Sequence, residues 1–199
     1  MPSMFIDTIP EEVAEGLLAD YYQQQKDAWG FLPNYAGAFS SRPEVAMAWG
    51  SLNKAVRDGM DRRRFEIATI GAARALRSTY CTAAHSKFLR DACDDETTMM
   101  AIAEDPSGAG LSDLDRAVYE FAARVATDAA SIGQRDVEGL RELGLSDGDV
   151  ADVVFAAAAR CFFTRVLDGL GAHLDVQTAA TFPPEILESM TVGRSPSDR

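Results

Sequence analysis

Apolar residues recur at intervals of three and four along most of this chain, which is the spacing that places them on one face of an α-helix. After Ser112, for example, Leu114, Val118, Phe121 and Val125 follow one another at this spacing. Alanine, the strongest helix former, is abundant, and β-branched residues rarely alternate with polar ones. The pattern therefore predicts an all-α fold.

Residues typical of helix ends divide this pattern into separate helices. Asp61, Ser112 and Ser146 can each accept a hydrogen bond from a backbone N–H group of a first helical turn. Prolines and glycines mark most of the other breaks. The expected helices cover residues 10–28, 43–58, 62–77, 81–92, 95–104, 113–127, 134–143 and 147–169. A loop or short broken helix is expected at 31–43 and a linker at 105–110.

The length of the chain favours a single domain. With 199 residues, 47% of them apolar, it is long enough to bury a core. Two of its segments, 66–74 and 152–160, resemble each other, so a duplicated helical unit stays open as the origin of the bundle. We expect one domain over residues 1–199, with a core at about 30–172, an N-terminal helix at about 10–28 and a polar, frayed tail at about 182–199.

The charge of the chain limits its partners. A net charge of -12 argues against nucleic acid, whose phosphates need a basic surface, and against an anionic membrane surface. No apolar run reaches the length of about 18 residues that a membrane helix needs. The first residues, MPSMFIDTIPEE, lack the basic start and apolar stretch of a secretion signal. We therefore expect a soluble cytoplasmic protein without nucleic-acid or membrane partners.

Few residues are suited to bind metal or form disulfides. The three cysteines, Cys81, Cys93 and Cys161, are too few and too far apart for a disulfide framework. A zinc site needs three or four converging ligands, and no spacing around His85 or His173 suggests one. No glycine-rich nucleotide loop or serine-hydrolase elbow occurs either. We expect neither a metal nor a cofactor.

Cys81 and His85 form the most informative pair. They are four positions apart, which places them on one face of a helix. In the first turn of that helix, the free N–H groups and the helix dipole favour a thiolate, and the imidazole can accept the thiol proton. Glu66 on the preceding helix is a candidate to orient the imidazole. The simplest alternative is that Cys81 is an ordinary buried residue.

The segment EIATIGAARALRSTYCTAAHSKFL resembles the motif of the AhpD-like family. That motif is a glutamate, eleven residues, a cysteine, two residues, a cysteine, three residues and a histidine. Glu66, Cys81 and His85 stand in this register, and Ser78 stands where the first cysteine is expected. The flanking sequences over about residues 30–172 are similar to the peroxidase-related branch of this family, which also includes carboxymuconolactone decarboxylases.

The resemblance implies an AhpD-like helical bundle that assembles as a homo-oligomer and acts as a cofactor-independent thiol peroxidase. Cys81 would attack the peroxide, and Glu66 and His85 would relay protons. In two-cysteine relatives the other cysteine closes a disulfide, which Ser78 cannot do, so an external thiol would complete the cycle. We expect Ser78 and Tyr80 in the substrate pocket. The aromatic residues Trp49, Phe162 and Phe163 are expected to pack in the hydrophobic core and not to form a binding site.

Several alternatives remain open. Cys93 lies twelve residues after Cys81, about 18 Å along one straight helix, so it is too distant for a disulfide. Cys161 would reach Cys81 only through tertiary packing. The protein could instead be a carboxymuconolactone-decarboxylase-like lyase or isomerase that acts on a small acid, where His85 matters and Cys81 does not. It could also be a non-catalytic helical oligomer with a remnant site.

Overall fold

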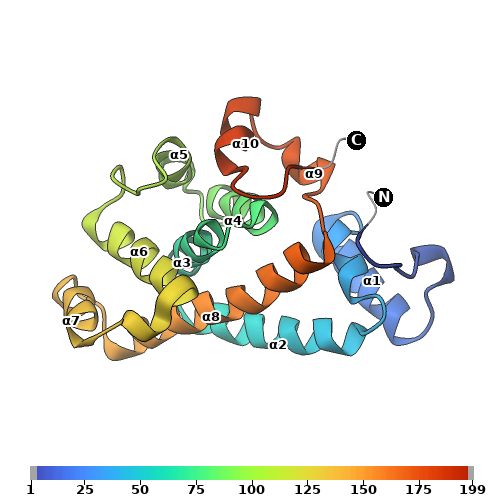
Figure 1. Ribbon diagram of the computed structural model, residues 1–199, viewed down its shortest axis with the longest axis horizontal. Helices are drawn as coiled ribbons and strands as arrows, with labels where there is room; N and C mark the ends of the chain where they lie inside the picture. The colour runs from blue at the N-terminus through green and yellow to red at the C-terminus, as the bar shows by residue number, and fades with distance from the viewer. Residues whose placement is uncertain (1–3, 197–199) are drawn as a thin grey trace.

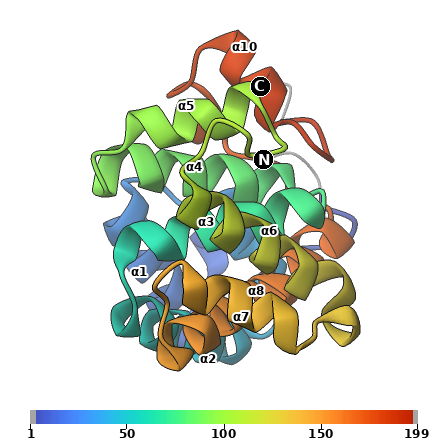
Figure 2. The same ribbon diagram turned by 90° about the vertical axis from the view of Figure 1, so that its left-hand side faces the viewer.

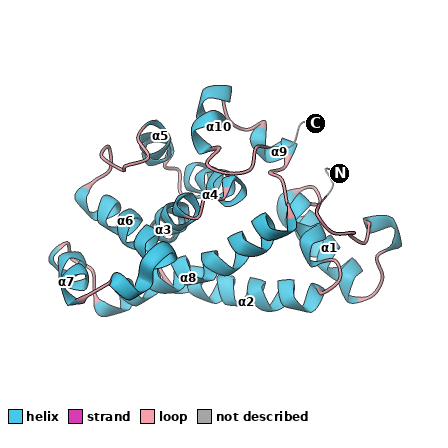
Figure 3. Cartoon of the chain, viewed as in Figure 1, coloured by secondary structure: helices cyan, strands magenta, loops and turns pink. Residues whose placement is uncertain are grey.

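A computed structural model describes residues 4–196 as a bundle of helices (Figures 1 and 3). This part of the chain contains no strand, and the all-α prediction is confirmed. Short 3₁₀ turns span Glu11–Val13, Asn34–Phe39 and Ala129–Ser131. The helices are α1 Leu17–Trp29, α2 Pro43–Gly59, α3 Arg62–Ala75, α4 Thr79–Ala92, α5 Glu96–Glu104, α6 Asp113–Asp128, α7 Gln134–Glu142, α8 Asp147–Leu170, α9 Val176–Ala179 and α10 Pro184–Met190.

Helix α3 lies at the centre of the bundle. It packs against α4, α6 and α8, and both ribbon views show it enclosed by these elements (Figures 1 and 2). Every residue from Phe65 to Ala73 is buried, although a surface helix would bury only one face. At Gly71 the approach is closest, because a Cβ atom there would lie 2.4 Å from the backbone oxygen of Tyr119 on α6. Glycine therefore allows the two helices to touch.

The predicted caps are present. Asp61 accepts a hydrogen bond of 2.8 Å from the backbone N–H of Arg64 at the start of α3. Ser112 and Ser146 accept the corresponding bonds at the starts of α6 and α8. The largest difference is the first helix, which was expected from residue 10: α1 begins at Leu17, after a 3₁₀ turn at Glu11–Val13. Helix α4 begins at Thr79, two residues before its expected start.

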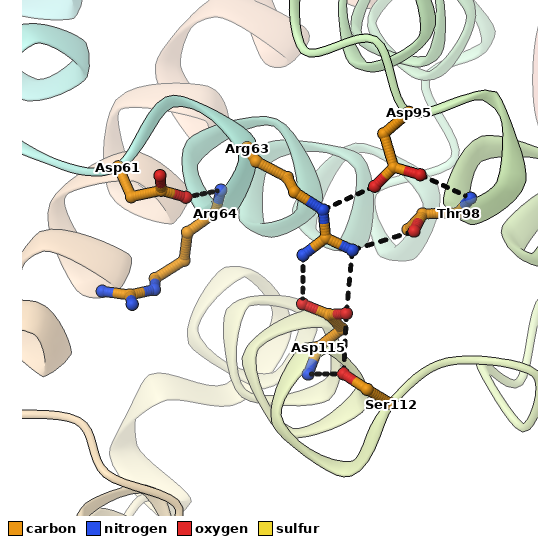
Figure 4. A network of polar contacts seen from close by, with 7 residues as sticks. All are labelled: Asp61, Arg63, Arg64, Asp95, Thr98, Ser112 and Asp115. Atoms are coloured by element: carbon orange, nitrogen blue, oxygen red, sulfur yellow. Dashed lines mark hydrogen bonds and ion pairs between the residues drawn. The ribbon is translucent and has the colours of Figure 1, made fainter.

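Arg63 links three helices near the site described below. From α3 its guanidinium group donates to both carboxylate oxygens of Asp115 on α6, at 2.7 and 2.9 Å. It also binds Asp95 and Thr98 at the start of α5 (Figure 4). Asp95 at the same time caps α5 through the N–H of Thr98. The first turn of α3 is therefore fixed on two sides.

The C-terminal tail differs from the expectation. Instead of fraying from residue 182, the chain forms α10, which packs against α4 and α5 (Figure 1). Phe182, Ile186 and Met190 are buried at a spacing of four, which is the signal of one apolar helix face. Beyond α10, the N–H of Gly193 donates to Thr79 at the start of α4. The end of the tail, 197–199, lies outside the described residues.

The described helices do not include any that combines the length and apolar character required to cross a lipid bilayer.

Candidate active site

The chain reverses direction between α3 and α4. Arg77 takes a left-handed backbone conformation with a φ of 59°, which is uncommon for a residue other than glycine. Ser78 then occupies the N-cap position of α4. Because of this reversal, α4 runs back beside α3, and His85 meets Glu66. Two residues nineteen positions apart in the sequence thus come into contact.

Glu66 is fully buried and uses both of its carboxylate oxygens. Oε2 lies 2.5 Å from Nδ1 of His85. Oε1 accepts a hydrogen bond of 2.6 Å from Nε of Arg62, one helical turn earlier on α3. A carboxylate in this place fixes the orientation of the imidazole ring and determines which ring nitrogen carries the proton.

The charges of this pair follow from its surroundings. Burial would raise the pKa of Glu66, but His85 and Arg62 together lower the pKa below its usual value. Burial, assisted by the positive charge of Arg160, lowers the pKa of His85 to about 4 although Glu66 opposes this. At neutral pH we therefore assign an ionised Glu66 and a neutral His85. Nδ1–H then donates to the carboxylate, and Nε2 keeps a free lone pair that can accept a proton.

Cys81 differs from the expectation in its protonation state. Its side chain lies in the first turn of α4 but is 1% exposed. Burial raises the pKa of the thiol above its usual value, although Arg160 and then Ser78 act in the opposite direction. Burial therefore opposes the thiolate that the helix terminus was expected to favour, and the resting thiol keeps its proton. A base has to remove the thiol proton before Cys81 can attack.

Arg160 of α8 is a site residue that the sequence analysis missed. Its Nη1 lies 3.8 Å from Sγ of Cys81, and its Nη2 lies 3.4 Å from the side-chain oxygen of Asn53 on α2. The signal was present in the sequence, because Arg160 continues a buried stripe that includes Val153, Ala156 and Leu167. An arginine on such a stripe indicates a buried charge with a specific purpose.

A cavity of about 360 Å³ lies beside Cys81, and we call it the Cys81 cavity. Cys81, His85, Glu66 and Arg160 all line it. Pockets with apolar walls and a few converging polar groups are typical of small-molecule sites. The aromatic part of the wall consists of Trp29, Tyr35, Trp49, Phe65, Tyr80, Phe88 and Phe163.

Two of the aromatic residues expected in the core belong to this wall. The rings of Trp49 and Phe163 are stacked with their centroids 3.9 Å apart, and both residues line the Cys81 cavity. Phe162 is instead 43% exposed, so its assignment to the core was wrong. Neighbouring residues of a helix point about 100° apart, and Phe162 consequently faces outward.

The two residues predicted for the substrate pocket lie in different places. Tyr80 lines the Cys81 cavity, and its hydroxyl group donates to the buried carboxylate of Asp175. Asp175 also accepts a hydrogen bond of 2.6 Å from the N–H of Asn34. No local sequence pattern indicates that Asp175 lies beside the cavity. Ser78 is buried and is not among the residues that line the cavity. Its hydroxyl group acts from behind the cavity wall as a hydrogen-bond partner that lowers the pKa of the Cys81 thiol.

The other two cysteines do not face Cys81. Cys93 is the C-cap of α4, at the opposite end of the helix from Cys81. Cys161 directly follows Arg160, but its Sγ lies 3.9 Å from the backbone oxygen of Ala126 on α6. All three thiols are free. Within residues 4–196, no three His, Cys, Asp or Glu side chains are grouped closely enough to hold a metal ion.

Comparison with protein families identifies the segment that carries the motif. Residues 43–110 match the model of the carboxymuconolactone decarboxylase family. This range contains Glu66, Ser78, Cys81 and His85, so the resemblance predicted from the motif is confirmed. No curated protein matches the chain.

Comparison with solved structures establishes the fold. An uncharacterised peroxidase-related protein from Ralstonia eutropha JMP134, described as an alkylhydroperoxidase AhpD core, is 20% identical, with a TM-score of 0.78 over 98% of this chain and 100% of that one. The chain has the AhpD-like fold. Another peroxidase-related protein, from Silicibacter sp. TM1040, is also 20% identical, with a TM-score of 0.71 over 87% of this chain and 90% of that one.

A third similar structure shares the AhpD-like fold and has a different activity in its name. It is a Cys-to-Ala variant of the debrominase Bmp8 in complex with 2,3,4-tribromopyrrole. It is 17% identical to this chain, with a TM-score of 0.75 over 95% of this chain and 98% of that one. At this level of identity the likeness concerns the fold alone.

Proposed function

We propose that this protein is a cofactor-independent thiol oxidoreductase of the alkylhydroperoxidase type, in which Cys81 reduces a small peroxide. The observation that carries the proposal is the convergence of Cys81 with the Glu66–His85 pair on one cavity. A buried thiol next to a neutral imidazole has both the nucleophile and the base that the reaction needs. The peroxidase-related names of two similar structures support the same chemistry.

The first step of the reaction removes the thiol proton. Nε2 of His85 accepts it, and Glu66 stabilises the imidazolium that forms. The thiolate then attacks the terminal oxygen of the peroxide, and the O–O bond breaks. His85 returns the proton to the departing oxygen, so the products are an alcohol and a Cys81 sulfenic acid. Arg160, 3.8 Å from Sγ, stabilises the negative charge on the sulfur.

The second half of the cycle needs an external thiol. Ser78 cannot form a disulfide, Cys93 lies at the other end of α4, and Cys161 faces α6. One thiol molecule condenses with the sulfenic acid and releases water, and a second one reduces the mixed disulfide. The two external thiols leave as a disulfide, and Cys81 returns to its starting state.

The direct test is to label the sulfenic acid. The wild type, treated with a hydroperoxide and a sulfenic-acid probe, should carry label on Cys81, and Cys81→Ser should lose peroxide turnover. Cys161→Ser removes a partly buried thiol outside the cavity. It is the matched control and should keep peroxide turnover. Label distributed equally over the three thiols would refute the proposal. A protein active as Cys81→Ser but inactive as His85→Ala would point to the lyase or isomerase alternative.

Removal of halogen from a small aromatic ring is the second candidate. It is favoured by the aromatic wall of the Cys81 cavity together with the debrominase among similar structures. In this reaction an external thiol pair would supply two electrons, and the products would be the dehalogenated ring, halide and a disulfide. Release of bromide from a bromopyrrole, with no reduction of hydroperoxide under the same conditions, would decide for this candidate.

A further inference from the structure

Arg160 is buried without a counter-ion. It is 2% exposed, and no carboxylate of residues 4–196 pairs with it. A guanidinium group carries five N–H donors, yet the hydrogen-bond contacts of Arg160 are a sulfur atom at 3.8 Å and an amide oxygen at 3.4 Å. Its Nε–H has no partner in this part of the chain. Such a buried charge is strongly unfavourable unless an anion compensates it.

The other arginines of the Cys81 cavity are already matched. Arg62 forms an ion pair with Glu66, and Arg57 forms one with Asp58. Among the residues lining the cavity, Arg160 is therefore the one guanidinium group without an anionic partner. This excess of positive charge occurs in a protein whose net charge is -12. The charge of Arg160 attracts a small anion into the Cys81 cavity, whereas the acidic surface of the protein repels anions.

The walls of the cavity add a requirement for shape. The guanidinium carbon of Arg160 lies 5.6 Å from the ring centroid of Trp49 and 5.5 Å from that of Phe163. These rings hold the guanidinium group in place, and further aromatic side chains continue the wall toward His85. Aromatic rings favour offset or edge contacts with another ring. The wall therefore suits a flat, unsaturated ligand.

We propose that the Cys81 cavity binds a small aromatic carboxylate, with its carboxylate group on Arg160 and its ring against the aromatic wall. The planar fork of a guanidinium group matches a carboxylate through two parallel hydrogen bonds. The proposal rests on the proposed function in one respect: the aromatic acid occupies the cavity in which the chemistry at Cys81 takes place. Binding itself requires no turnover.

The chain contains its own reporter for this binding. Both of its tryptophans, Trp29 and Trp49, line the Cys81 cavity. Tryptophan fluorescence, titrated with benzoate at constant ionic strength, should therefore change and saturate. Benzamide has nearly the same shape without the charge, and acetate has the charge without the ring. We expect both to bind at least tenfold more weakly than benzoate.

Variants of Arg160 test whether the carboxylate lies where we place it. R160M should bind benzoate and benzamide equally, and R160K should keep a preference for benzoate. R165M removes an exposed arginine from the same helix and should behave like the wild type. Equal binding of benzoate and benzamide to the wild type would overturn the proposal. So would an equal loss of benzoate binding in R165M and R160M, or acetate binding as tight as that of benzoate.

One variant separates this proposal from the proposed function. C81A removes the thiol but leaves Arg160 and the aromatic wall in place, and we expect it to bind benzoate like the wild type. If the sulfenic-acid test fails while C81A and the wild type both bind benzoate, the carboxylate site stands and the peroxidase proposal falls. If sulfenic acid forms on Cys81 but neither protein binds benzoate, the peroxidase proposal stands and the carboxylate site falls.

Discussion

At the scale of single residues, the position of one proton decides how the site works. The burial of Cys81 keeps its thiol protonated, and the burial of His85 keeps its imidazole neutral. Both groups are therefore uncharged at rest, between an ionised Glu66 and the cation of Arg160. Moving the thiol proton to Nε2 creates a thiolate near Arg160 and an imidazolium near Glu66. Each new charge thus forms close to an opposite charge.

This arrangement predicts the pH dependence of thiol alkylation. In a protein with Cys93→Ser and Cys161→Ser, the rate of reaction with iodoacetamide should rise with pH. The midpoint should lie above about 8.5, the value of a free cysteine, because burial raises the pKa of Cys81. R160M should move the midpoint further up, since Arg160 lowers the pKa. A midpoint near that of a catalytic thiolate, about 6 or lower, would contradict the assignment of a protonated thiol.

His85 predicts how stability depends on pH. Its pKa in the folded protein is about 4, whereas an unfolded histidine titrates near 6.5. Between these values the unfolded chain binds more protons, so stability decreases as pH falls through this window. From pH 7 to pH 5 this contributes a loss of about 2 kcal/mol, which His85→Gln should remove from urea-unfolding curves. His173→Gln, which changes the chain's other histidine, is the matched control. An equally flattened curve in that variant would contradict the prediction.

The sequence predicted the part of the site that lies on two consecutive helices. Cys81 and His85 are one helical turn apart, and Glu66 reaches them through a single reversal of the chain, so their spacing is fixed locally. Arg160 and Asp175 arrive from the far end of the chain, and only tertiary packing brings them to the cavity. The resting charge of Cys81 was missed for the same reason, because burial is a property of the packed protein.

At the scale of elements, the position of the site depends on the contact between α3 and α6. Gly71 is the point of closest approach, and a Cβ atom there would meet backbone, which cannot move aside. Gly71→Ala should therefore destabilise the protein by about 1–3 kcal/mol, although alanine is the better helix former. Gly139→Ala is the control, because α7 has open space at that position. It should stabilise the protein by about 0.5–1 kcal/mol. Urea unfolding measures both, and a neutral Gly71→Ala would contradict the close approach.

Helix boundaries were predicted well where a side chain caps the helix and less well elsewhere. Asp61, Ser112 and Ser146 mark starts that the structure reproduces. The start of α4 has no side-chain cap bond, and there the expectation was two residues late. Helix α10 was missed because two prolines and a polar ending concealed its apolar face. A spacing of four between Phe182 and Ile186 was the signal that remained visible.

At the scale of the whole molecule, the adjacent helices α2 and α8 present large apolar side chains to solvent. Phe155 and Phe162 of α8 are 55% and 43% exposed, and Leu52 of α2 is 53% exposed. The two phenylalanines are seven positions apart, about two helical turns, so they share one side of α8. Exposed apolar side chains grouped in this way are typical of surfaces that contact another protein molecule.

The predicted homo-oligomer can be tested on this surface. If copies of the chain meet through α8, the double variant Phe155→Gln, Phe162→Gln should have the mass of a monomer in size-exclusion chromatography with light scattering. Val13→Gln removes an equally exposed apolar side chain near the N-terminus and should leave the assembly unchanged. Because each copy carries a net charge of -12, assembly should also weaken as ionic strength falls. A monomeric wild type, or a double variant that keeps its full mass, would exclude this interface.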